Sequence, residues 1–198
     1  MSFETELQAY KKLIKETAQL EDAIYTECDL EFADDESLED DLESLLEGGT
    51  CEYELKPFAI DGAGGVYAAL NDNYIGYMTS EGQCGIVARN IRDFFVLLLN
   101  CKMLYDYFRE GVFDNPTAFI NKFNEVNGQV ESQTNKEIID AFIEKNQFET
   151  NPEILYKIMK EAVITEPSFI IEPTIDGYEY SDDLFGTEQQ YIHQLRKQ

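Results

Sequence analysis

The stretch from Cys51 to Ala88 reads CEYELKPFAIDGAGGVYAALNDNYIGYMTSEGQCGIVA, and it decides the fold. Its apolar residues fall into four short runs, at residues 52–60, 66–70, 74–78 and 84–88. Glycine, asparagine and serine separate these runs, and such residues accept the backbone conformations of tight turns. Connections this short join neighbouring antiparallel strands. The stretch therefore predicts a strand meander, in which Pro57 marks an edge strand or an irregularity.

A strongly apolar helix is predicted directly after the meander. Asn90 is suited to cap it, Asp93 takes its third position, and the residues up to Phe108 leave little polar face. We expect this helix to end at Gly111 and to pack on the sheet as the central helix. The predicted fold class is α+β, with a central, mostly antiparallel sheet flanked by helices.

Two helices are predicted before the meander. Apolar residues recur every three or four positions from Phe3 to about Tyr25, as one buried helix face requires. A second helix is expected to begin at Ser37 as its cap and to end at Gly48 and Gly49.

Three further helices are predicted towards the C-terminus. Their expected caps are Asn115, Thr134 and Asn151, and Asn115 and Asn151 are each followed by proline. A short strand is expected at residues 169–171, and the tail from Asp176 onward is expected to be partly loose.

The length of 198 residues suggests a single domain. We divide it into acidic N-terminal helices (1–50), the sheet with its central helix (51–110), a helical appendage (111–166) and a tail (167–198). These extra C-terminal helices extend the α+β core.

The formal net charge of -25 restricts the partners of the chain. Binding to phosphate requires clustered Lys and Arg, so direct nucleic-acid binding is not expected, and anionic membranes are poor partners for the same reason. A basic protein is the natural complement. Acidic surfaces also serve solubility alone, so composition leaves both interpretations open.

The negative charge is concentrated near the N-terminus, because no Lys or Arg occurs between Glu16 and Leu55. The candidate partner-binding residues are Asp34, Asp35, Glu36, Glu39, Asp40 and Asp41. Tyr25, Phe32 and Tyr53 are candidate aromatic anchors on the same surface, and packing inside the domain is the alternative role for them.

The sequence predicts no enzyme, no cofactor and no metal site. It has no recognisable nucleotide, metal or nucleophile motif, and its single histidine, His193, lies near the end of the chain. The four cysteines do not have zinc-site spacing and are expected to be buried thiols. The N-terminus does not resemble a signal peptide, and the longest apolar run, residues 94–99, is too short to cross a bilayer. We therefore expect a cytoplasmic protein.

Residues 56–99 resemble the SUKH superfamily. The run PFAIDGAGGVY at residues 57–67 is similar to the family's F-A-x-D-G-x-G strand and turn. YIGYM at 74–78 resembles the next family strand, and GIVARNIRDFF at 85–95 resembles the passage into the helix that follows it. The chain departs from the family in having no Trp and no L-P-x-x-Y helix near the N-terminus, and the helices after Gly111 lie outside the usual family core.

The resemblance implies an α+β fold and a binding role. Bacterial members of the family are mostly immunity proteins that neutralise toxins, many of which are nucleases, and eukaryotic relatives include a regulator of cell-wall assembly. A nuclease site is cationic, so clustered carboxylates suit such a partner. An adaptor or regulator unrelated to toxins is the alternative, and an enzyme whose site the sequence does not reveal is a third hypothesis.

Overall fold

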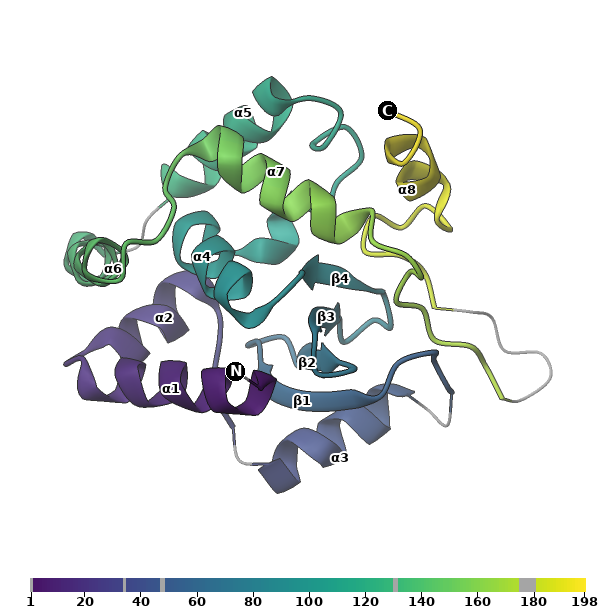
Figure 1. Cartoon of the computed structure of the whole chain (residues 1–198), viewed down its shortest axis with the longest axis horizontal. Coiled ribbons are helices and arrows are strands. Elements are labelled where there is room, and N and C mark those ends of the chain that lie inside the picture. The colour runs from purple at the N-terminus through teal and green to yellow at the C-terminus, as the bar shows by residue number, and fades with distance from the viewer. Residues whose placement is uncertain (1, 34, 47–48, 130–131, 175–180) are drawn as a thin grey trace.

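The computed structural model describes residues 2–33, 35–46, 49–129, 132–174 and 181–198 (Figure 1). The fold is α+β, as predicted, with a four-stranded antiparallel sheet flanked by helices. The strands are β1 (Leu55–Ile60), β2 (Val66–Leu70), β3 (Tyr74–Met78) and β4 (Cys84–Ala88), in the order β1-β2-β3-β4. The predicted meander is confirmed, and Pro57 marks both an edge strand and a shift of register.

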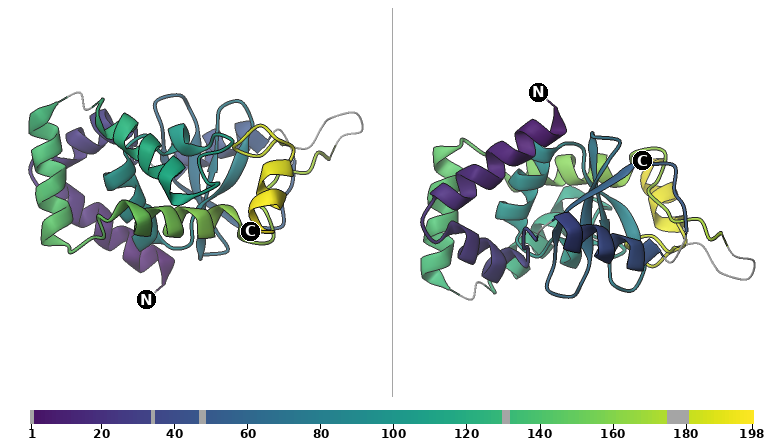
Figure 2. Two further views of the ribbon diagram at one scale, coloured as in Figure 1. Left: turned by 90° about the horizontal axis from the view of Figure 1, so that it is seen from above. Right: turned by 90° about the horizontal axis from the view of Figure 1, so that it is seen from below.

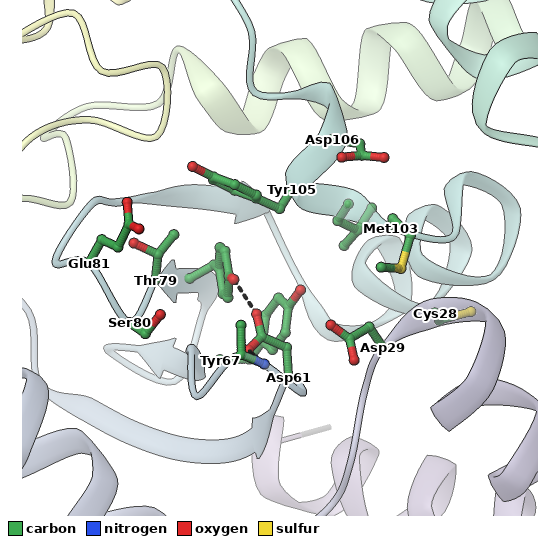
Figure 3. A pocket seen from close by; sticks show the side chains of 13 residues that line it. Cys28, Asp29, Asp61, Tyr67, Thr79, Ser80, Glu81, Met103, Tyr105 and Asp106 are labelled. Carbon is green, nitrogen blue, oxygen red and sulfur yellow. Dashed lines mark hydrogen bonds between the residues drawn. The ribbon is translucent and has the colours of Figure 1, made fainter.

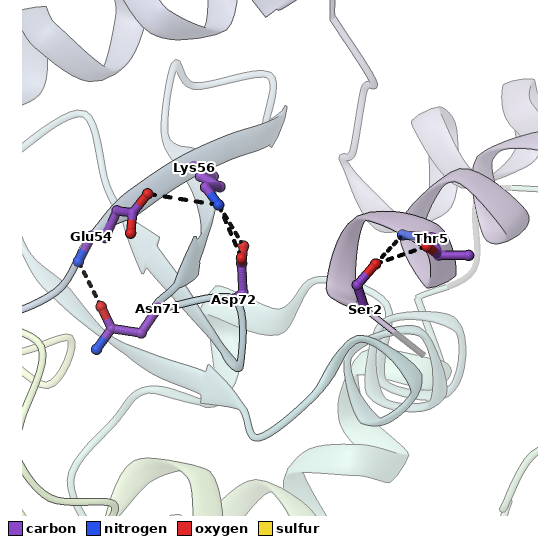
Figure 4. A network of polar contacts seen from close by, with 6 residues as sticks. All are labelled: Ser2, Thr5, Glu54, Lys56, Asn71 and Asp72. Carbon is purple, nitrogen blue, oxygen red and sulfur yellow. Dashed lines mark hydrogen bonds and ion pairs between the residues drawn. The ribbon is translucent and has the colours of Figure 1, made fainter.

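The turn between β2 and β3 is held by side chains of its own sequence (Figure 4). Asn71 and Asp72 have φ of 53° and 55°, in the left-handed region that Asn and Asp enter more readily than most residues. The Asn71 side-chain oxygen accepts a hydrogen bond of 2.8 Å from the backbone N–H of Glu54. The Lys56 ammonium lies 2.9 Å from the Asp72 carboxylate. The turn is therefore tied to β1 as well as to the strands it joins.

Alternate residues of a strand point to opposite faces of the sheet. In this protein, helices cover both of these faces. On one face Tyr67, Ala69 and Ile75 join the cluster that contains α4 (Ile91–Cys101). On the other face Val66, Leu70 and Met78 pack with Leu42 of α3 (Asp35–Leu46). Figures 1 and 2 show α3 and α4 on opposite sides of the sheet, and α7 (Pro152–Val163) packs against β4.

The central helix is shorter than predicted. The Asn90 side chain accepts a hydrogen bond of 2.8 Å from the Asp93 N–H, which confirms the expected cap. The helix ends at Cys101 and not at Gly111, because Lys102 adopts a φ of 64° and turns the chain away. Apolar periodicity continues through the 3-10 turn η1 (Leu104–Tyr107), whose buried residues belong to the same core.

The N-terminal region also differs from the prediction. The single helix expected from Phe3 to Tyr25 is two helices, α1 (Phe3–Glu16) and α2 (Leu20–Cys28), and Gln19 between them has a φ of 65°. Ser2 caps α1 by accepting a hydrogen bond from the Thr5 N–H (Figure 4).

Ser37 is not the cap of the second predicted helix. Helix α3 begins two residues earlier, at Asp35, where acidic residues are favoured by the positive end of the helix dipole. Its described part runs to Leu46, and the expected stop at Gly48 lies outside the described residues.

The C-terminal helices are α5 (Pro116–Asn127), α6 (Gln133–Lys145), α7 and α8 (Gln190–Leu195). Asn115 and Asn151 cap α5 and α7 as predicted. Helix α6 is capped by Ser132 and not by Thr134. The backbone N–H of Ser132 also donates a hydrogen bond of 2.9 Å to the Glu27 carboxylate, and this contact with α2 helps to set where α6 begins.

The segment 111–166, expected as an appendage, shares its core with the central helix. Phe119 of α5, Ile139 of α6 and Leu155 of α7 are all fully buried in the cluster that contains α4. The strand expected at 169–171 is wrong, since this region has only an isolated bridge between Thr50 and Glu172.

The tail contributes to the core as well. Asp176 lies outside the described residues, but residues 181–198 pack against the domain through Leu184, Tyr191 and Leu195. Within the described part of the chain, none of the helices combines the length and the apolar character that crossing a bilayer requires.

Candidate functional site

The outer face of α3 carries a continuous stripe of carboxylates. Glu36, Glu39, Asp40 and Glu43 are exposed, and their spacing of three and four residues places them on one side of the helix. The opposite side holds Leu38 and Leu42, which are buried against the sheet. Packing of the apolar stripe therefore points the carboxylates outward.

The predicted partner-binding residues do not all join this stripe. Glu36, Glu39 and Asp40 lie on it, while Asp41 is half-buried at its flank. The backbone of Asp35 begins α3, but its side chain is not among the described parts of the chain. Asp34 lies outside the described residues. None of the ion pairs formed among the described residues involves α3.

Of the three candidate aromatic anchors, Tyr25 is the one with an exposed ring. Tyr25 is 55% exposed on α2. Tyr53 is buried, and its hydroxyl donates a hydrogen bond of 2.5 Å to the Pro167 carbonyl. Phe32 is half-buried beside Phe95. Tyr53 and Phe32 therefore pack within the domain, which is the alternative role.

A second acidic feature is a pocket of about 230 Å³ that no local pattern in the sequence indicates (Figure 3). The pocket is lined by the end of α2, the β1–β2 turn, strands β2 and β3, the β3–β4 turn and the segment around η1. Its charged side chains are all carboxylates, namely those of Asp29, Asp61, Glu81 and Asp106.

Three tyrosines build the apolar part of this pocket. The rings of Tyr67 and Tyr77 stack with centroids 4.5 Å apart, and Tyr105 meets Tyr77 edge to face at 6.1 Å. Tyr105 and Met103 are each 41% exposed at the mouth. Burial raises the pKa of Tyr67 and Tyr77, so both phenols stay neutral at physiological pH.

Asp61 holds the floor of the pocket in place. One of its carboxylate oxygens accepts hydrogen bonds from the N–H groups of Ala63 at 2.9 Å and Gly65 at 2.7 Å, and the other accepts one from the Tyr77 hydroxyl. A side chain on residue 65 would collide with the Tyr77 hydroxyl, so glycine is needed there. Asp29 caps the same turn by accepting a hydrogen bond of 3.0 Å from the Gly62 N–H.

The combination of carboxylates and aromatic faces suits a cation. A Lys or Arg side chain gains Coulomb attraction from the carboxylates and a favourable contact with the negative face of an aromatic ring. His193 is exposed on α8 and does not line this pocket.

The cysteines are free thiols and do not form a recognisable metal centre. Cys28, Cys84 and Cys101 are buried, and Cys51 is half-buried. Among the residues that the structure describes, no cluster of three His, Cys, Asp or Glu is arranged to hold a metal ion.

No protein-family model matches the chain, and no curated protein or solved structure shows significant similarity to it. Sequence reasoning found the acidic stripe because it lies in one segment. It missed Asp29, Asp61, Met103 and Tyr105, which come together only in the folded chain. The one sequence signal for this site is the apolar run that continues past Cys101, and by itself this run predicts a longer buried helix.

Proposed function

We propose that this chain is a non-catalytic binding protein that captures a basic partner protein and neutralises it, in the manner of an immunity protein acting on a toxin. The observation that carries the proposal is the exposed carboxylate stripe of α3, which lies in a segment without any Lys or Arg. The resemblance of residues 56–99 to the SUKH superfamily supports the toxin as the partner class.

The physical basis is electrostatic steering. A concentrated negative surface raises the rate at which a cationic partner meets it, by about 10- to 1,000-fold at low salt. Exposed charges act mainly on the association rate, whereas buried anchors set the dissociation rate. The α3 stripe accordingly supplies capture, and the tyrosine pocket supplies an anchoring point for a Lys or Arg of the partner.

The first test identifies the partner and its effect. The tagged chain is used to capture proteins from its native cell extract, and each basic protein recovered is produced alone in a test host. The proposal expects a protein that arrests growth, and it expects co-production of this chain to restore growth. A specific basic partner without toxicity would favour the adaptor alternative instead.

The second test measures association kinetics with that partner. The variant Glu36→Gln, Glu39→Gln and Asp40→Asn removes three charges from the stripe. The matched control Glu110→Gln, Glu137→Gln and Glu153→Gln removes three exposed charges from other parts of the chain. The stripe variant should lose about tenfold or more in association rate at low salt, with a flatter salt dependence. Equal losses in the two variants would show that the effect comes from net charge, and they would refute a specific role of the α3 stripe.

A further inference from the structure

Lys102 is a buried cation at a backbone position that favours glycine. It follows the last residue of α4 with a φ of 64° and a ψ of −113°, where a side chain is strained. Its side chain is nevertheless buried, and the residue is only 5% exposed. Glycine would relieve this strain, so a role for the lysine side chain is implied.

Within the described part of the chain, no carboxylate is paired with the ammonium of Lys102. Among the described residues it has no hydrogen-bond partner and takes part in no ion pair. The neighbouring thiols of Cys28 and Cys101 do not supply a counter-charge, because burial raises the pKa of each to about 12 and keeps both protonated. A buried charge without a partner is costly, and a bound anion would reduce that cost.

Lys102 lines a cavity of about 660 Å³ together with residues of α4, α5 and α6. This volume is within the range of small-molecule sites. Leu99, Phe123, Ile143 and Phe148 form its apolar wall. The other charged residues that line it are Lys136, which is ion-paired with Asp140, and Glu144.

We propose that this cavity binds a small molecule that carries one carboxylate on an apolar body, with the carboxylate paired to Lys102. The apolar wall takes the body of the ligand. Asp140 and Glu144 repel a doubly charged group such as a phosphate more strongly than a single carboxylate. The ammonium is buried, and we infer that rotation about the terminal bonds of the flexible lysine side chain would turn it towards the cavity that this residue lines. None of the residues that line this cavity lies on α3 or lines the acidic pocket.

The test compares ligands that differ only in the charged group. Octanoate and 4-phenylbutyrate are the carboxylate probes, and 1-octanol and 4-phenylbutanol are their neutral counterparts. Titration calorimetry on the full chain should give at least about tenfold tighter binding for the carboxylate of a pair. Backbone amide shifts should move at Leu99 and Phe148 and leave α3 unchanged.

Two lysine variants separate charge from shape. Lys102→Met keeps the length of the side chain and should abolish the preference for the carboxylate, whereas Lys102→Arg should retain it. Lys145→Met, which removes a charge from the end of α6, is the matched control and should bind as the parent does. Three results would each overturn the proposal: equal binding of acid and alcohol, no binding of either acid, or amide shift changes remote from the cavity. If Lys102→Met fails to fold, the amide shifts of the parent chain still decide whether the ligand binds in the cavity.

Discussion

The Tyr77 hydroxyl donates a hydrogen bond to the Asp61 carboxylate, and this contact ties the third strand to the turn between the first two. Asp61 also accepts hydrogen bonds from the backbone N–H groups of Ala63 and Gly65 in that turn. The same two side chains line the acidic pocket. This one polar contact therefore contributes both to holding the meander together and to the shape of the pocket.

Removing this hydroxyl should destabilise the fold measurably. In Tyr77→Phe the ring and its stacking on Tyr67 remain, but one oxygen of the buried Asp61 loses its partner. We expect a loss of about 1–3 kcal/mol in the free energy of unfolding, measured by urea denaturation. Tyr25→Phe, at an exposed ring, is the control and should change stability by less than about 0.5 kcal/mol. Equal effects in both variants would contradict the assigned role.

Asp183 should be a second sensitive carboxylate, because it organises the end of the chain. It is fully buried and accepts hydrogen bonds from the backbone N–H groups of Phe185, Thr187 and Gln189 and from the Thr187 hydroxyl. Asp183→Ala leaves these donors unpaired and should cost about 3 kcal/mol or more. Limited proteolysis should then cut the variant faster near residues 181–198. Glu188→Gln, at an exposed neighbour, should behave as the parent, and an equally resistant Asp183→Ala would show that the tail is held by its apolar contacts alone.

The parts of the fold that follow from local chemistry were predictable. The meander depends on short turns, and the caps at Asn90, Asn115 and Asn151 depend on a side chain bonding to a backbone group two or three residues away. Two of the differences concern long-range contacts. The start of α6 at Ser132 involves Glu27 of another helix, and the packed tail depends on the burial of Asp183.

The candidate sites show the same division. The carboxylate stripe of α3 was visible because its residues lie within one helix. The pocket around Tyr77 was not, since Asp29, Asp61 and Tyr105 are brought together from three segments. Lys102 could not be noticed either, because its interest comes from burial and from the absence of a partner among the described residues.

Alkaline pH should destabilise the protein through its buried thiols. Burial raises the pKa of Cys28, Cys84 and Cys101 to about 12 each, whereas a thiol in the unfolded chain titrates near 8.5. Between these values the unfolded chain releases protons that the folded chain retains, so unfolding is favoured as pH rises. Each thiol contributes a decrease of at most about 1.4 kcal/mol per pH unit in this window. Urea denaturation from pH 8 to 11 should show the decrease, and Cys101→Ala should have a shallower slope than the parent. An identical slope would exclude this thiol as a source.

Tyr105 should determine how slowly a captured partner dissociates. Tyr105 stands at the mouth of the acidic pocket, where its hydroxyl donates a hydrogen bond of 2.7 Å to the Gln83 side chain and its ring meets Tyr77. Exposed aromatic residues beside a pocket are typical binding hot spots. If a Lys or Arg of the partner enters this pocket, Tyr105→Ala should raise the dissociation rate by about tenfold or more and change the association rate by less than about twofold. The α3 variant should show the reverse pattern, because exposed charges act on the encounter.

Ile154→Ala is the matched control for this measurement, since Ile154 is another exposed large side chain, 38% exposed on α7 and outside the pocket. Urea denaturation of each variant separates loss of binding from loss of folding. A Tyr105→Ala variant that is folded and dissociates at the parental rate would remove the pocket from the interface. Capture by α3 would then have to be followed by anchoring elsewhere, and the exposed Tyr25 would be the next residue to substitute.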